Sequence, residues 1–168
     1  MVLKKNSNTY INISIKNQML SLYDRHVLVK RFSVSTAKRG LGQQKNSYQT
    51  PLGKHVVRAK IGDSLPIFTV FSARRPANKV WTSEDSKCHP KKDWILTRII
   101  WLSGLELGFN RLGDVDTMQR YIYIHGTPYE NDLGHPASEG CIRMGNRDVI
   151  ELFNLISIGT HVLISLSL

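Results

Sequence analysis

The chain has 168 residues, of which 41% are hydrophobic and 21% are charged, a composition typical of one soluble globular domain spanning residues 1–168. Two cysteines are too few for a disulfide framework, and no apolar run reaches the roughly 18 residues that a membrane span requires. The net charge of +10 is unevenly distributed, because residues 1–120 carry 21 Lys and Arg against 8 Asp and Glu, whereas residues 121–168 carry 2 against 5. This basic body suits an acidic substrate. Because no nucleic-acid motif accompanies it, we expect no nucleic-acid partner.

The N-terminal residues bear on where the protein works. Residues 1–8 contain neither an apolar stretch of about seven residues nor the small-residue cleavage site of a secretory signal. A cytoplasmic location is therefore expected. The alternative is a periplasmic location, if an export segment has been removed.

Alternating apolar and polar residues predict strands along most of the chain. The first three are expected at Tyr10–Ile15, Met19–Tyr23 and His26–Thr36, with an irregularity in the third at Lys30-Arg31. Further strands are expected at residues 55–61, 66–73, 94–103, 121–125, 142–144 and 161–166.

Two segments depart from the strand pattern. Residues 74–93 are polar and rich in Lys and Pro, which predicts a long loop. Residues 147–155 have an apolar face at helical spacing, which predicts a single short helix with Asn146 as its N-cap. Many short strands and one helix favour a mainly-β fold, an open antiparallel sheet that is sandwich- or barrel-like.

Residues 120–145 hold the candidate chemistry. A predicted strand delivers His125 to its end, and a loop then leads to Gly140-Cys141. A thiol with a reference pKa of about 8.5 is only slightly ionised at neutral pH, so an adjacent imidazole base would activate it. Gly140 leaves room for a substrate carbonyl and for backbone N–H groups that could hold an oxyanion. The alternative is a small buried Cys and a hydrogen-bonded structural His.

The ordered set His125-Gly126 … Ser138-x-Gly140-Cys141-Ile142-Arg143 resembles the signature of the L,D-transpeptidase (YkuD-type) family of bacterial peptidoglycan enzymes. The similarity extends to residues 10–35, to the turn Thr50-Pro51-x-Gly53 and to residues 146–168, so that it covers nearly the whole chain. It implies the mainly-β fold of that family. One position departs from the signature, because Glu139 stands where the family usually has a second His.

This resemblance implies a role for each matching residue. Cys141 would be the nucleophile, and His125 would take its proton and later return one to the leaving amine. Gly126 would orient the His side, and Ser138 would stiffen the approach to the nucleophile. Backbone N–H groups around Gly140 and Cys141 would hold the oxyanion.

Four further residues are candidate substrate contacts: Arg143, Glu139, Thr127 and His135. Arg143 could pair with a substrate carboxylate or form a structural ion pair. Glu139 could raise the pKa of Cys141 by like-charge repulsion, support His125 as an imidazolium, or face solvent. His135 could substitute for the missing second His.

The implied reaction is cysteine-dependent acyl transfer at the L,D bond of a stem tetrapeptide, between its third residue (commonly meso-diaminopimelate) and the terminal D-Ala. Because no export signal is visible, we expect hydrolysis by an L,D-carboxypeptidase of murein recycling. The alternatives are an L,D-transpeptidase that forms cross-links or exchanges terminal D-amino acids, and a non-catalytic muropeptide-binding relative. No metal or cofactor is expected. A catalytic Cys141 should also be alkylated faster than Cys88 near neutral pH.

Overall fold

The computed structural model describes residues 8–90 and 92–167. The residues on which the expectation about an export signal depends, 1–7, lie outside this part. Within the described ranges, no helix has the length and apolar character needed to cross a membrane.

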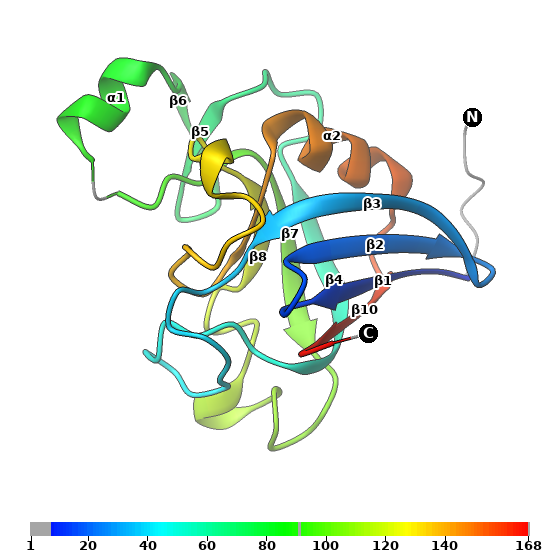
Figure 1. The fold of residues 1–168 in the computed structure, drawn as a ribbon. Coiled ribbons are helices and arrows are strands. Elements are labelled where there is room, and N and C mark those ends of the chain that lie inside the picture. Colours follow the sequence, from blue (N-terminus) through cyan, green and yellow to red (C-terminus); the bar gives the residue numbers. More distant parts are fainter. Residues whose placement is uncertain (1–7, 91, 168) are drawn as a thin grey trace.

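β-strands are the predominant regular structure of the described chain, which also has two α-helices (Figure 1). The strands are β1 Thr9–Ser14, β2 Met19–Asp24, β3 Val27–Ser35, β4 Gly53–Ile61, β5 Thr69–Ser72, β6 Arg75–Val80, β7 Leu96–Gly104, β8 Tyr123–Gly126, β9 Ile142–Met144 and β10 His161–Ser165. The α-helices are α1 Ser83–Cys88 and α2 Asn146–Leu155, and single 3-10 turns occur at Gly113–Val115 and Glu130–Asp132.

Eight of these strands form a closed ring in the order β4-β10-β1-β2-β3-β9-β8-β7, which the pairing of β7 with β4 completes. The short strands β5 and β6 extend the sheet beyond β7. The predicted mainly-β, sandwich- or barrel-like fold is confirmed. The sheet is closed rather than open, because β7 pairs with β4. It is mixed rather than purely antiparallel, because β10 lies parallel to β1 and β9 lies parallel to β8.

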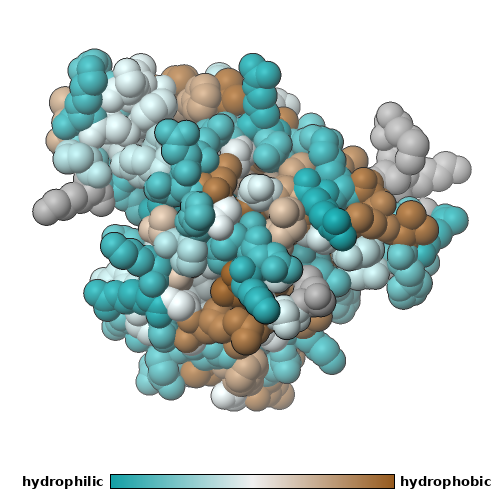
Figure 2. All heavy atoms as spheres, in the orientation of Figure 1, coloured by the Kyte–Doolittle hydropathy of each residue, from teal (hydrophilic) through white to brown (hydrophobic). Residues whose placement is uncertain are grey.

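The hydrophobic core fills the interior of the ring. Ile11 and Ile13 of β1 are fully buried, and Val149, Leu152 and Phe153 of α2 belong to the same cluster. Helix α2 lies against β7 and β8 (Figure 1), and burial of each large apolar side chain stabilises the fold by about 1.5–3 kcal/mol. Hydrophilic side chains cover most of the molecular face in Figure 2, where apolar residues form separate patches.

The segment 74–93 is more ordered than the sequence predicts. It contains β6, which pairs with β5 through a two-residue turn at Ala73-Arg74, and both turn residues have a positive φ (46° and 67°). That conformation suits a hairpin turn but is normally formed by Gly, Asn or Asp, so its usual sequence signal is missing. Helix α1 then begins with a capping box formed by Thr82 and Asp85.

Candidate active site

The parallel pairing of β8 with β9 assembles the predicted site. The register places Ile124 opposite Ile142 and His125 opposite Arg143. Because side chains alternate along a strand, the two isoleucines enter the core, where both are fully buried. His125 and Arg143 then share the other face, and Cys141 precedes β9 on that same face. The parallel register thus places the predicted nucleophile and base on the same face of the sheet.

His125 has one nitrogen available as a base. Its Nδ1 lies 2.8 Å from the carbonyl oxygen of Gly126. Because a carbonyl only accepts hydrogen bonds, Nδ1 carries the proton and Nε2 is the basic nitrogen. Nε2 is buried and has no hydrogen-bond partner in the described part of the chain. Burial lowers the pKa of His125, against an opposing effect of Asp93, so the imidazole is neutral, as a general base must be.

Cys141 is half-buried, and backbone groups hold its sulfur. Sγ accepts a hydrogen bond from the N–H of Tyr123 and donates one to the carbonyl of Tyr121, both at 3.3 Å. Burial raises the pKa of Cys141 to about 12, against the opposing effect of the Tyr123 N–H. The resting pair is therefore a thiol and a neutral imidazole rather than a preformed ion pair.

The turn before the nucleophile is fixed by two hydroxyl groups. Ser138 Oγ accepts the Gly140 N–H at 3.2 Å and donates to the Cys141 carbonyl at 2.6 Å. Thr50 Oγ1 donates to the Gly140 carbonyl at 2.9 Å. In a trans peptide the carbonyl and the next N–H point in opposite directions, so the Cys141 N–H faces away from Thr50. The Gly140 N–H already donates to Ser138 Oγ. Of the two predicted oxyanion donors, only the N–H of Cys141 therefore remains available.

Glycine is required twice at this site. Gly140 has a φ of +127°, a conformation that other residues adopt only with strain. A Cβ at Gly126 would lie 2.5 Å from Asn146 Oδ1 and 2.8 Å from the Leu96 carbonyl oxygen, so β8 can approach β7 and α2 only without a side chain there.

Arg143 forms the structural ion pair that was the alternative to substrate binding. Its Nε and Nη2 lie 3.0 and 2.8 Å from Asp93 Oδ1. The Arg143 side chain is only 7% exposed, and its guanidinium lies 5.5 Å from the centre of the Tyr129 ring. The predicted contact with a substrate carboxylate is thus replaced by a contact with Asp93.

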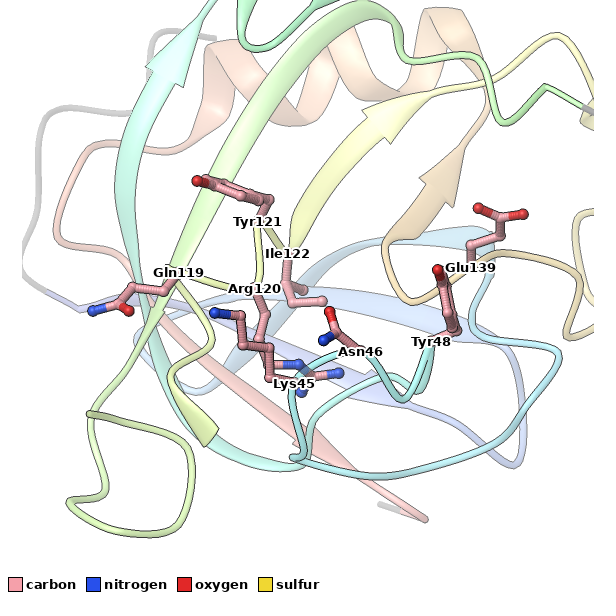
Figure 3. A pocket seen from close by; sticks show the side chains of 8 residues that line it. All are labelled: Lys45, Asn46, Tyr48, Gln119, Arg120, Tyr121, Ile122 and Glu139. Carbon is pink, nitrogen blue, oxygen red and sulfur yellow. The ribbon is translucent and has the colours of Figure 1, made fainter. Parts of the chain in front are cut away.

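Glu139 is exposed and lines two cavities. The first has a volume of about 200 Å³ and is lined by Lys45, Asn46, Tyr48, Gln119, Arg120, Tyr121, Ile122 and Glu139. Figure 3 shows Lys45 and Arg120 on one side of it and Tyr48 and Glu139 on the other. The second, of about 380 Å³, is lined by Lys38, Arg39, Tyr48, Ala137, Ser138 and Glu139. Of the three roles considered for Glu139, the structure matches the solvent-facing one, and the carboxylate that raises the pKa of Cys141 is Asp93.

Two other predicted substrate contacts lie elsewhere. Thr127 is completely buried, and its Oγ1 accepts the N–H of Tyr129 at 3.2 Å, so its side chain has no surface for a substrate. His135 is exposed and lines neither cavity; its carbonyl accepts a hydrogen bond from Ser35 Oγ at 2.7 Å.

Several residues that support the site were missed by the sequence-based prediction. Asn146 is the first residue of α2, and Gly145 is the N-cap, so the predicted capping role of Asn146 is wrong. Its side chain instead donates to the Thr127 carbonyl at 2.6 Å and accepts from Thr97 Oγ1 at 2.5 Å. Arg120 donates to the carbonyls of Gly42 and Gln49 at 3.0 and 2.6 Å. These hydrogen bonds join segments that are far apart in the sequence. The sequence indicated a role for Arg120 and Asn146 only in that both residues flank the motif.

Comparison with known proteins identifies the family of this chain. A profile of the L,D-transpeptidase catalytic domain (YkuD) matches residues 8–164. YqjB of Bacillus subtilis strain 168, named as a candidate L,D-transpeptidase, is 46% identical over 59 residues, which cover 35% of this chain and 32% of YqjB. YkuD of the same strain, named in the same way, is 50% identical over 42 residues, covering 25% of this chain and 26% of YkuD.

Solved structures show the same fold. L,D-transpeptidase 3 from Mycobacterium tuberculosis superimposes with a TM-score of 0.58 at 16% identity, over 94% of this chain and 61% of that one. The chain thus spans less than two thirds of the proteins that it matches. Since the family profile nevertheless covers nearly all of residues 1–168, the chain belongs to the L,D-transpeptidase catalytic-domain family.

Proposed function

We propose that this chain catalyses cysteine-dependent acyl transfer at the L,D bond of a peptidoglycan stem tetrapeptide, between its third residue (commonly meso-diaminopimelate) and the terminal D-Ala. The observation that carries the proposal is that a half-buried thiol, Cys141, and a neutral imidazole, His125, lie on the same face of the paired strands β8 and β9, and that His125 Nε2 is buried with no hydrogen-bond partner in the described part of the chain. An unsatisfied buried nitrogen is costly and is expected where function needs it.

The proposed reaction begins with a neutral pair. His125 Nε2 takes the thiol proton as Cys141 Sγ attacks the scissile carbonyl carbon, and the N–H of Cys141 stabilises the oxyanion. The C–N bond then breaks, His125 returns the proton to the amine of the leaving D-Ala, and a thioester remains. Attack of water on the thioester, with His125 again as base, releases the tripeptide acid and restores the thiol.

Hydrolysis is proposed as the main outcome. The two cavities that Glu139 lines have volumes of about 200 and 380 Å³, and neither is lined by Cys141 or His125, so their size does not decide between acceptors. Hydrolysis needs only water as the acceptor, whereas cross-linking needs a subsite for a second stem peptide. Cross-linking and exchange of the terminal D-amino acid are the alternative outcomes of the same thioester.

The test is incubation of the purified protein with a murein tetrapeptide, followed by mass spectrometry. Loss of one D-Ala is expected with the native protein and with a Cys88→Ala variant, which lacks the second thiol, and no loss is expected with Cys141→Ala. Detection of a peptide dimer or of an exchanged D-amino acid would show that the protein catalyses transpeptidation rather than hydrolysis. An unchanged peptide with the native protein would contradict the proposal and favour the non-catalytic muropeptide binder.

A further inference from the structure

The substrate just proposed ends in a free carboxylate, and the cation predicted to bind a substrate carboxylate is already paired. Arg143 gives both Nε and Nη2 to Asp93 and is only 7% exposed. Arg120 is near the nucleophile, but its donors are bound to the carbonyls of Gly42 and Gln49 and to Ser47 Oγ. A different cation beside Cys141 is therefore needed for this role.

Arg74, in the two-residue turn between β5 and β6, is positioned to bind the substrate carboxylate. Its guanidinium lies 4.6 Å from the ring centre of Tyr121 and 5.0 Å from that of Trp101. Its Nη1 donates to Tyr123 Oη at 3.2 Å. The ring contacts use the face of the planar guanidinium, so donors along its edge remain for a ligand. Arg74 is half-buried, and no carboxylate of the described chain lies within ion-pair distance of it.

The two tyrosines connect Arg74 to the nucleophile. The carbonyl of Tyr121 accepts a hydrogen bond from the Cys141 thiol, and the N–H of Tyr123 donates one to the Cys141 sulfur. Arg74 contacts the side chains of these same two residues, so its guanidinium is one tyrosine side chain away from the reacting sulfur. In a tetrapeptide, the terminal carboxylate is separated from the scissile nitrogen by a single carbon atom. This short segment of the substrate and a tyrosine side chain are of comparable length, so a guanidinium at the far end of Tyr121 and Tyr123 can reach that carboxylate.

We infer that Arg74 binds the free C-terminal carboxylate of the acyl donor, and so selects peptides that end one residue after the scissile bond. This inference rests on the proposed function and names the group that the same site recognises. Stacking on two aromatic rings and the bond to Tyr123 fix the guanidinium before the ligand arrives, which reduces the entropy lost on binding. A planar guanidinium also matches a carboxylate in a bidentate geometry.

The test compares a tetrapeptide with its C-terminal amide, by measuring kcat/KM for release of D-Ala or D-Ala amide. The native protein is expected to prefer the acid. In Arg74→Ala, kcat/KM for the acid should fall about 30- to 100-fold, mainly through KM, which is the range for loss of a charge-assisted hydrogen-bond pair. Turnover of the amide should change less than threefold, so the preference disappears. Arg74→Lys should recover part of it.

Arg75→Ala is the matched control, because it removes the same charge from the adjacent, exposed position of the hairpin. It should keep the native preference. A preference for the acid that survives in Arg74→Ala would overturn the inference. Equal losses on acid and amide would also overturn it, since they would show that Arg74 only supports Tyr121 and Tyr123.

Two further outcomes separate this inference from the proposed function. Native protein that releases nothing from either peptide contradicts the proposed function. Calorimetry of the tetrapeptide acid with Cys141→Ala protein then tests Arg74 without turnover, because adding Arg74→Ala should weaken binding at least tenfold. Equal binding by the two inactive variants would contradict the inference alone.

Discussion

At the scale of single residues, the main feature of the site is that burial keeps both proposed reacting groups, the Cys141 thiol and the His125 imidazole, neutral. The pKa of Cys141 is raised to about 12 and that of His125 is lowered, in both cases chiefly because burial disfavours the charged form. Asp93 raises the pKa of both groups and Arg143 lowers it. Because these two side chains form an ion pair with each other, their effects largely oppose one another. The thiol is thus protected until a substrate carbonyl is present and proton transfer can accompany attack.

This neutral pair reverses the sequence-based expectation for alkylation. We predict that free Cys141 reacts with iodoacetamide at least tenfold more slowly than the exposed Cys88 near neutral pH, because a raised pKa leaves very little thiolate. The rate at Cys141 should rise as the pH increases toward about 12. Mass spectrometry of Cys88→Ala and Cys141→Ala variants separates the two rates. Faster alkylation of Cys141 at neutral pH would show an ion pair with His125 instead.

At the scale of elements, the sequence predicted those parts of the site that depend on local pattern. Alternation along residues 121–125 predicted a strand that carries His125, and β8 at Tyr123–Gly126 agrees. The parallel register of β8 with β9, which puts Cys141 on the same face, was not predicted. The contacts of Arg143 with Asp93 and of Thr50 with Gly140 span 50 and 90 residues. Such pairs leave no periodic signal in a single sequence. The predicted irregularity at Lys30-Arg31 was close, since the β2–β3 register shifts at the neighbouring Val29.

The loop that precedes β4 acts on the nucleophile through Thr50. Its Oγ1 accepts the Ala37 N–H and donates to the Gly140 carbonyl, both at 2.9 Å, and Thr50 is fully buried. Thr50→Val keeps the shape of the side chain but leaves both backbone groups unsatisfied. We predict a loss of about 1–3 kcal/mol in the free energy of unfolding and at least a tenfold loss in kcat, because the Cys141 N–H is no longer held in place.

The control for this change is Thr160→Val. Thr160 is also buried, and its Oγ1 accepts the Ser157 N–H at 3.2 Å in the connection between α2 and β10. Urea unfolding should show a loss of stability for this variant too, while its kcat stays native. Native kcat in Thr50→Val, measured with the tetrapeptide, would exclude a role for the loop in positioning the nucleophile.

At the scale of the whole molecule, closure of the ring depends on β4. This strand pairs with β10 on one side and with β7 on the other, and β7 in turn pairs with β8, which carries His125. His55 occupies the closing position, opposite both Val162 of β10 and Gly104 of β7. A change at this one position therefore acts on the closure of the ring and, through β7, on the strand that holds the base.

His55 gives this closure a dependence on pH. It is fully buried, with Nδ1 2.9 Å from the Gly53 carbonyl and Nε2 3.1 Å from Thr117 Oγ1. Burial lowers its pKa from 6.5 to about 4, against the opposing effect of the Gly53 carbonyl. The unfolded chain thus takes up a proton below 6.5 that the folded chain resists until about 4. Stability from this group is complete above 6.5 and decreases as the pH falls toward 4, by about 3 kcal/mol in total.

Urea unfolding at about pH 7 and about pH 4.5 measures this loss, and His55→Gln is the control, because glutamine keeps a hydrogen-bonding side chain that does not titrate. The variant is expected to be less stable than the native protein at pH 7 but to lose less stability on acidification. Part of the loss should remain, since His125 is also buried with a lowered pKa and acts with the same sign. Equal losses in the two proteins would show that acid acts on the ring through other groups than His55.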